Sequence, residues 1–149
     1  MANFFRYDPN TDSWTRLPSP SNYSRLDPGG GGVIDKKLYL IGPRILEYDP
    51  VTSRWTRKAS WGRGLWGRTV AMLSHLYMFG AELNGGGAPS YGIFIYDPVS
   101  HTWEKKPLLT EFGFWGVDEL TPTRVFLNGQ PRIEVVGGAR PGNNMQYIP

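Results

Sequence analysis

The sequence predicts an all-β fold made of repeated antiparallel units, and three observations lead to it. The 149 residues are rich in glycine (19), proline (13) and aromatic residues (14%), a composition that favours short strands and turns. No stretch keeps the apolar spacing of a helix for more than two turns, so we expect almost no helix. The segment "RYDPNTDSW" also returns twice in related form, and such recurrence indicates a repeat architecture.

Each copy of this segment joins Tyr-Asp-Pro to a tryptophan seven residues after the tyrosine. The three pairs are Tyr7 and Trp14, Tyr48 and Trp55, and Tyr96 and Trp103. Apolar residues before each tyrosine are typical of a strand. Asp-Pro then begins a turn, because the carboxylate can accept backbone N–H bonds and proline fixes the next φ. The tryptophan opens the outgoing strand, and we expect all three to pack in the core between neighbouring sheets.

A further pair of strands accompanies each unit. The stretches "GGGVIDKKLYLIG" and "RTVAMLSHLYMFG" each read as two strands around a short turn. The stretch "PTRVFLNGQPRIEVVGG" gives another pair around Asn128-Gly129, a strong hairpin signal. Each unit is therefore predicted to be a four-stranded antiparallel meander, whose strands we call a, b, c and d in chain order.

With these four elements in this order, the sequence resembles the kelch repeat family. The glycine-ended b strands "YLIG", "YMFG" and "VVGG", the Tyr-Asp-Pro turn and the tryptophan carry the resemblance over nearly the whole chain. Two features depart from the family pattern. The first two b strands end in one glycine rather than a pair, and the last copy reads Tyr147-Ile148-Pro149. Kelch repeats each form one blade of a propeller, so the resemblance implies a kelch-type β-propeller.

The order of the strands predicts a single domain over residues 1–149 with three blades per chain. Residues 1–17 are assigned to strands c and d of a shared blade, and residues 18–58 and 59–107 to one blade each. Residues 108–149 are assigned to strands a and b of the shared blade, with a short c strand considered around Met145–Tyr147.

Closed propellers have about four to eight blades. Three blades alone would leave bare sheet edges, which soluble proteins avoid. We therefore expect two copies to form one six-bladed ring as a C2 homodimer. The alternatives are a longer polypeptide, a different complementary half-propeller, and an open monomer.

The irregular b–c loops and d–a crossovers are predicted to share one face of the propeller, where function usually lies. They are rich in Trp, Tyr and Arg, the residue types that dominate interface hot spots. The candidate binding residues are Tyr23, Arg25, Arg44, Trp61, Arg63, Trp66, Arg68, Tyr91, Trp115 and Arg140. Trp66 and Trp115 recur at nearly equivalent positions, so packing between blades is the alternative for both. Arginines around a channel mouth would favour an acidic or carboxylate-bearing ligand.

The sequence predicts no catalytic group, no metal site and no cofactor. Kelch-type folds include copper radical oxidases and sugar-acid isomerases, but without cysteine the Tyr–Cys cofactor of the oxidases cannot form. His75 and His101 fall in turns on the face opposite the loops. The adjacent pair Asp118-Glu119 could serve as acid and base in a sugar site, or could belong to a solvated turn.

We therefore expect a non-catalytic module or scaffold that recognises a protein or peptide through its loop face. The alternatives are a carbohydrate-binding or sugar-modifying propeller, and a structural subunit of a larger assembly. The net charge of +3 is scattered along the chain, so no nucleic-acid partner is indicated. The sequence has neither a signal-peptide pattern nor an apolar run of membrane-spanning length, and we expect a cytoplasmic protein without membrane contact.

Overall fold

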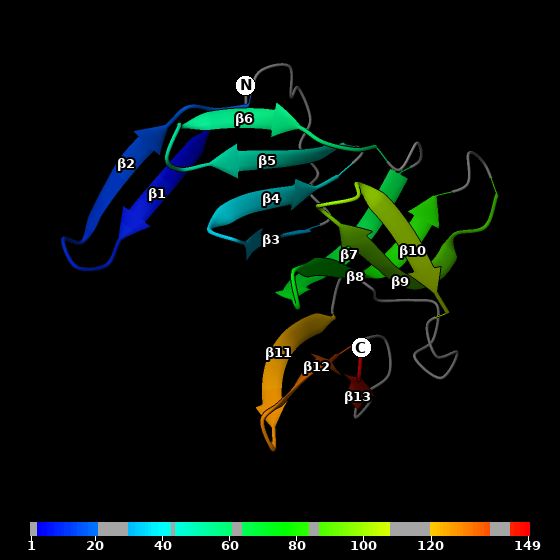
Figure 1. Cartoon of the computed structure of the whole chain (residues 1–149). Coiled ribbons are helices and arrows are strands. Elements are labelled where there is room, and N and C mark those ends of the chain that lie inside the picture. Colours follow the sequence, from blue (N-terminus) through cyan, green and yellow to red (C-terminus); the bar gives the residue numbers. More distant parts are fainter. Residues whose placement is uncertain are drawn as a thin grey trace.

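The strands are arranged as four antiparallel sheets that follow one another along the chain (Figure 1). The computed structural model describes residues 3–20, 30–42, 44–60, 64–83, 87–107, 120–137 and 144–149. No helix occurs within these ranges. The all-β class predicted from composition and turn residues is confirmed for them.

The two complete sheets each have four strands in meander order. The second sheet contains β3 (Gly30–Ile34), β4 (Lys37–Ile41), β5 (Ile45–Asp49) and β6 (Arg54–Arg57). The third sheet contains β7 (Gly64–Met72), β8 (His75–Leu83), β9 (Ser90–Asp97) and β10 (Thr102–Lys106).

The first and fourth sheets have fewer strands. The first sheet is the hairpin of β1 (Phe4–Asp8) and β2 (Ser13–Leu17). The fourth sheet contains β11 (Thr121–Leu127), β12 (Gln130–Val136) and β13 (Asn144–Tyr147). The hairpin predicted at Asn128-Gly129 joins β11 to β12, and β13 is the short third strand considered around Met145–Tyr147.

The repeated segment has one local structure in all three copies. Each tyrosine lies directly opposite its tryptophan on the neighbouring strand. The ring centroids are 5.0 Å apart for the first two pairs and 5.1 Å apart for the third. The aspartate closes the turn as predicted, since its carboxylate accepts the backbone N–H two residues later at 2.8 to 2.9 Å.

The residue before each outgoing strand is left-handed. Asp12, Ser53 and His101 occupy this position with φ of 48°, 55° and 59°. In the first copy the Tyr7 hydroxyl donates to the Asp12 carboxylate at 2.7 Å, and in the third copy the Tyr96 hydroxyl lies 3.1 Å from His101 Nδ1. His101 therefore lies in the turn before β10, where its ring contacts the Tyr96 hydroxyl.

Two apolar clusters hold neighbouring sheets together, and the third sheet contributes to both. Successive side chains of a strand point to opposite faces, so β8 directs Leu76 and Met78 toward the second sheet and Tyr77 and Phe79 toward the fourth. All four side chains are buried. The third sheet is thus covered on both faces, which explains why β8 and β9 are apolar along nearly their whole length.

The first sheet packs on the second through aromatic rings. Phe4 lies edge-on to Tyr48 and Trp55, with ring centroids 5.0 and 5.2 Å apart. The Trp55 indole also donates from Nε1 to the carbonyl oxygen of Pro18 at 2.7 Å. The tyrosine–tryptophan pair of the second sheet therefore receives a side chain from β1, the strand of the first sheet that carries Tyr7.

One acidic side chain is buried between the second and third sheets. Glu47 accepts a hydrogen bond from the Tyr39 hydroxyl at 2.6 Å, and the ammonium groups of Lys37 and Lys58 each lie 3.2 Å from its oxygens. Burial raises the pKa of Glu47, but these three donors together outweigh burial and leave the pKa below its ordinary value. The carboxylate is therefore stabilised in its ionised form.

This network gives the fold a pH-dependent contribution. Because the pKa of Glu47 is lower in the folded chain than in the unfolded chain, its contribution is present at neutral pH and is lost as the pH falls through and below 4.5. We expect Glu47→Gln to cost about 1–3 kcal/mol at pH 7 and to flatten the acid dependence of the unfolding free energy. Denaturant titrations at several pH values measure both effects.

The matched control is Glu134→Gln, which changes an exposed carboxylate on β12. It should leave both the stability at pH 7 and the acid slope close to those of the unmodified chain. An acid slope that Glu47→Gln leaves unchanged would contradict this account of the network.

Candidate functional site

Four of the ten candidate residues lie in the part of the chain that the structure describes. They are Arg44, Trp66, Arg68 and Tyr91. The other six candidates fall outside the described residues: Tyr23, Arg25, Trp61, Arg63, Trp115 and Arg140. Asp118 and Glu119 also lie outside the described residues. The candidate site is therefore built from the four.

The pairing register brings three of these four residues onto one face of the third sheet. Trp66 on β7 lies opposite Ala81 on β8, which lies opposite Tyr91 on β9. Arg68 follows two positions after Trp66, so its side chain belongs to the same face. Arg44 precedes β5 of the second sheet and is exposed, but it does not belong to this group.

The group of Trp66, Arg68 and Tyr91, which we call the aromatic row, lies near the loop end of the third sheet. Only two rows of paired residues separate Trp66 and Ala81 from the ends of β7 and β8 at this side. Trp66 is 43% exposed, whereas Ala81 is completely buried between the two aromatic positions. Tyr91 is partly buried and packs against the apolar cluster that the third and fourth sheets share. The row thus combines an exposed indole, a guanidinium and an anchored phenol ring.

Close contact between β7 and β8 fixes where Trp66 stands. Gly67 and Gly80 face one another across the two strands, in the row next to Trp66. A Cβ atom on Gly80 would collide with the carbonyl oxygen of Trp66 and would lie 2.7 Å from Cα of Gly67. Only glycine allows the two backbones to approach this closely, so the spacing between β8 and β7, the strand that carries Trp66, depends on these two positions.

An ion pair supports the same end of the third sheet from its opposite face. Glu82 is 9% exposed, and its Oε2 lies 3.3 Å from the ammonium group of Lys105. Lys105 also donates to the Ser90 hydroxyl at 2.7 Å and lies 5.1 Å from the ring centre of Phe94. The charge of Glu82 is therefore compensated within the sheet, and it does not oppose an acidic ligand on the face of the aromatic row.

A second exposed aromatic group lies on the first sheet. Phe5, Tyr7 and Trp14, which we call the terminal aromatic face, are 46%, 43% and 70% exposed. Trp14 was expected in the core, and within one chain this expectation is wrong. On the other face of the hairpin, Phe4 of β1 packs on Tyr48 and Trp55 of the second sheet, whereas no described segment of the chain covers the face of Trp14.

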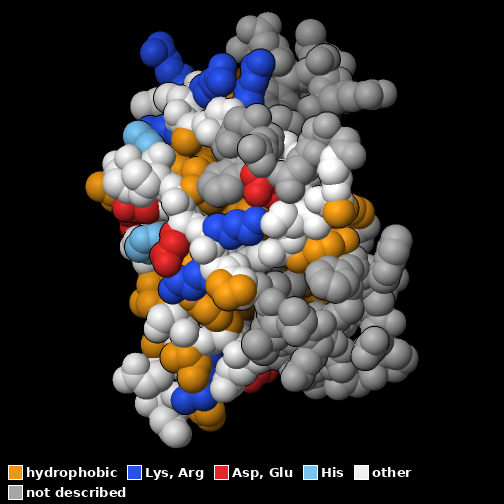
Figure 2. Space-filling view, turned by 90° about the vertical axis from the view of Figure 1, so that its right-hand side faces the viewer, with side chains coloured by type: hydrophobic (Ala, Val, Ile, Leu, Met, Phe, Trp, Pro, Cys, Tyr) orange, Lys and Arg blue, Asp and Glu red, His pale blue; other side chains and the backbone are white. Residues whose placement is uncertain are grey.

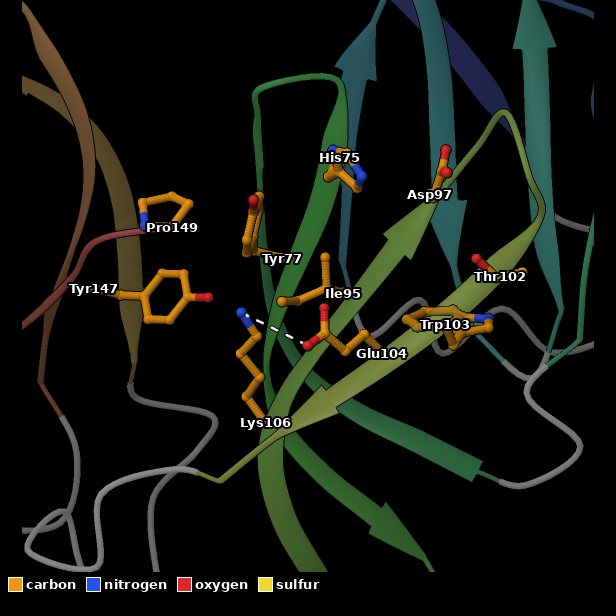
Figure 3. A pocket seen from close by; sticks show the side chains of 10 residues that line it. All are labelled: His75, Tyr77, Ile95, Asp97, Thr102, Trp103, Glu104, Lys106, Tyr147 and Pro149. Atoms are coloured by element: carbon orange, nitrogen blue, oxygen red, sulfur yellow. Dashed lines mark ion pairs between the residues drawn. The ribbon is translucent and has the colours of Figure 1, made fainter.

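A cavity of about 270 Å³ separates the third sheet from the end of β13 (Figure 3). It lies over β9 and β10, and its wall includes Ile95, Glu104, Lys106, Tyr77 and Tyr147. The Lys106 ammonium group lies 3.7 Å from the Glu104 carboxylate and 5.8 Å from the ring centre of Tyr147. Tyr147-Ile148-Pro149 repeats the Tyr-x-Pro spacing of the other units, and this spacing is the sequence signal from which such a cavity could be predicted.

Figure 2 shows the side of the molecule that lies to the right in Figure 1. Hydrophobic side chains are exposed there among Lys and Arg side chains, and both histidines lie along one edge beside acidic side chains. His75 Nδ1 lies 2.7 Å from the carbonyl oxygen of Leu73, within the turn between β7 and β8. Within the described ranges, no three His, Asp or Glu residues are close enough to hold a metal ion, and no helix could cross a membrane.

Comparison with known proteins gives a partial match to a kelch-repeat protein. No protein-family model matches the chain. A stretch of 50 residues is 40% identical to an F-box/kelch-repeat protein of Arabidopsis thaliana. This stretch makes up 33% of the present chain and spans 13% of the length of that protein. The match supports the resemblance to kelch repeats over a third of the chain, and the four antiparallel sheets fit a propeller-like fold.

The close approach of β7 and β8 generates a test of how Trp66 is positioned. We expect Gly80→Ala to destabilise the chain by about 2 kcal/mol or more, because the new methyl group meets backbone atoms that cannot move aside without separating the strands. The unfolding free energy from denaturant titration measures this cost.

Gly64→Ala, on β7 of the same sheet, is the matched control. A Cβ atom there would meet only atoms of the flexible Leu83 side chain, at 3.3 Å or more. We expect a cost below about 1 kcal/mol for this change. Equal costs at the two positions would show that the contact between Gly80 and Trp66 does not set the strand spacing.

Proposed function

We propose that the chain is a non-catalytic kelch-type β-propeller module that binds a protein or peptide at the loop end of its sheets. The observation that carries the proposal is the aromatic row, which places Trp66, Arg68 and Tyr91 on one face of the third sheet. Exposed Trp, Tyr and Arg side chains held on a rigid sheet are the usual anchors of protein interfaces. The partial likeness to an F-box/kelch-repeat protein gives independent support.

The chemistry of the aromatic row favours an acidic segment as ligand. An indole that is 43% exposed offers a large apolar surface at little entropic cost. The guanidinium of Arg68, on the same face, can form paired hydrogen bonds with a carboxylate. A peptide with an apolar side chain next to an Asp or Glu would satisfy both groups, and Arg44 on the neighbouring sheet adds positive charge at the same end.

We further propose that each chain supplies three blades and that two copies complete a six-bladed ring with C2 symmetry. In this arrangement residues 1–17 and 108–149 contribute to shared blades, and 18–58 and 59–107 form one blade each. Two features support the proposal: the first sheet has only two described strands, and the terminal aromatic face is exposed in a single chain.

A carbohydrate ligand is the second candidate, because an exposed indole on the same sheet face as a tyrosine can also stack on a sugar ring. The two candidates differ in what Arg68 does. A carboxylate-bearing peptide needs its charge, whereas a neutral sugar depends mainly on Trp66 and Tyr91. The ligand classes are therefore separable by variants of single residues.

Selection from a random peptide library tests the proposal. We expect enrichment of peptides that contain Asp or Glu beside an apolar residue. Binding of a selected peptide should weaken at least tenfold in Trp66→Ala and in Arg68→Ala, since each anchor is expected to contribute about 1–3 kcal/mol. Fluorescence polarisation with a labelled peptide measures the change.

The matched control is the pair Arg124→Ala and Phe126→Ala on β11. These residues also stand two positions apart, with the guanidinium 5.6 Å from the ring centre, and Phe126 is 64% exposed near the opposite end of its sheet. The control variant should bind the peptide normally. Two results together would favour a sugar ligand over a peptide. No peptide would be enriched, and the chain would bind a neutral glycan in a way that Trp66→Ala abolishes and Arg68→Ala preserves.

A further inference from the structure

We propose that the cavity beside β13 receives Trp14 of a second copy, and that the β1–β2 hairpin of this copy replaces β13 in the fourth sheet. The proposal rests on the six-bladed ring proposed above and specifies the contact between its two copies, which we call the seam. The partner surface is the terminal aromatic face, and the receiving surface is the outer half of the third sheet together with the edge of β12.

The register of the fourth sheet identifies what is missing from it. In the second and third sheets the repeat tyrosine lies opposite a leucine of the second strand, as Tyr48 opposite Leu38 and Tyr96 opposite Leu76. Tyr147 lies opposite Ile133 in the same way. In the complete sheets a fourth strand then places a tryptophan opposite the tyrosine, whereas no described strand follows β13 in the fourth sheet.

The cavity lies where this tryptophan would stand. Trp55 of the second sheet packs over the outer strands of the preceding sheet, against Phe4 and the carbonyl oxygen of Pro18. The cavity lies over the corresponding strands of the third sheet, β9 and β10, and has a volume of about 270 Å³. Pro18 stands four residues after Trp14, and Pro107 stands four residues after Trp103, so we expect the carbonyl oxygen of Pro107 to accept a hydrogen bond from an incoming indole.

The β1–β2 hairpin carries the complementary half. Its Tyr7 and Trp14 rings are 5.0 Å apart at 43°, the same geometry as Tyr48 and Trp55 within a covered sheet. Trp14 is nevertheless 70% exposed, so the pair is formed without a sheet to cover it. Docking of this hairpin would bury three aromatic side chains that are between 43% and 70% exposed in one chain.

The order of strands decides how the hairpin enters. Tyr7 and Trp14 are already paired across β1 and β2, so a hairpin that puts Trp14 in the fourth position also puts Tyr7 in the third. That position is held by Tyr147, and β13 must therefore leave. The alternative, in which β2 adds outside β13, would create a sheet of five strands and would direct the second copy away from the ring.

A second contact supports the same arrangement. Val33 on β3 is 61% exposed on the face that the two-stranded first sheet leaves uncovered. Leu127 on β11 is 46% exposed on the face that points away from the third sheet. Both stand at the hairpin end of their strands, next to the turns at Asp35 and Asn128. In the closed ring these two faces come together, so one seam buries apolar side chains on both sides of the shared blade.

Sedimentation equilibrium of the unmodified chain and two variants tests the seam. We expect the unmodified chain to have twice the single-chain mass of 16.8 kDa. Trp14→Ala should raise the dimer dissociation constant at least thirtyfold, as expected for a buried tryptophan anchor. Deletion of residues 144–149 should leave the dimer intact or tighter, because β13 competes with the incoming hairpin.

The controls separate this proposal from the proposed function and from misfolding. Trp66→Ala changes another exposed tryptophan and should remain dimeric while losing peptide binding. Trp14→Ala should melt cooperatively as a monomer, since Trp14 is largely exposed within one chain. Cross-linking from a photoreactive residue at position 14, in a mixture of isotopically light and heavy chains, should join position 14 to β9 or β10 of the other copy.

Three results would overturn the proposal. The first is a monomer of the unmodified chain at all concentrations, which would leave the cavity to another occupant such as a longer polypeptide. The second is a dimer that Trp14→Ala does not weaken. The third is loss of the dimer on deletion of 144–149, which would show that β13 is part of the seam rather than its competitor.

Discussion

This structure depends on the contact between the tyrosine–tryptophan pair of one sheet and a side chain from the tyrosine-bearing strand of the preceding sheet. Phe4 meets Tyr48 and Trp55 in this way, and Ile45 shares an apolar cluster with Tyr96 and Trp103. Short meanders of four strands bury little surface by themselves, and a sheet of this size needs a covered face to be stable. The repeated pair supplies that cover from one sheet to the next, which makes stacking of the sheets a consequence of the sequence repeat.

The same interaction explains why the two ends of the stack differ from its middle. The third sheet is covered on both faces, so its residues Phe79, Phe94 and Tyr96 are fully buried. The first sheet carries the same tyrosine–tryptophan pair, yet no described segment of the chain lies against it. An identical local geometry thus gives a core contact in one place and an exposed aromatic surface in another. The position of a unit in the stack, rather than its own sequence, decides which of the two it becomes.

Much of the fold could be predicted from the sequence because its determinants are local. Asp-Pro, Asn128-Gly129 and the spacing from tyrosine to tryptophan each depend on a few adjacent residues, and each turn and pairing was found where it was expected. Exposure of Trp14 could not be predicted in this way, because Trp14, Trp55 and Trp103 have the same local pattern and differ only in their distant neighbours. The cavity beside Tyr147 likewise depends on how two sheets face each other.

The candidate site also combines features that local sequence predicts with features that depend on distant parts of the chain. Composition of the loops pointed to Trp, Tyr and Arg as a class, but membership of one face depends on strand register. Trp66 and Tyr91 are 25 positions apart in the sequence and come together only because both pair with Ala81. Arg44, which the composition grouped with them, lies on a different sheet. Six of the ten candidates belong to segments outside the described residues, so register provides no argument about them.

A double-mutant cycle between Phe4 and Trp55 tests the central interaction most directly. The unfolding free energies of Phe4→Ala, Trp55→Ala and the double variant give the coupling between the first and second sheets without any assumption about oligomeric state, provided that all variants are compared at one protein concentration. The account predicts a favourable coupling of about 0.5–1.5 kcal/mol, the range found for edge-on aromatic pairs. A coupling indistinguishable from zero would mean that the aromatic pair does not join the two sheets.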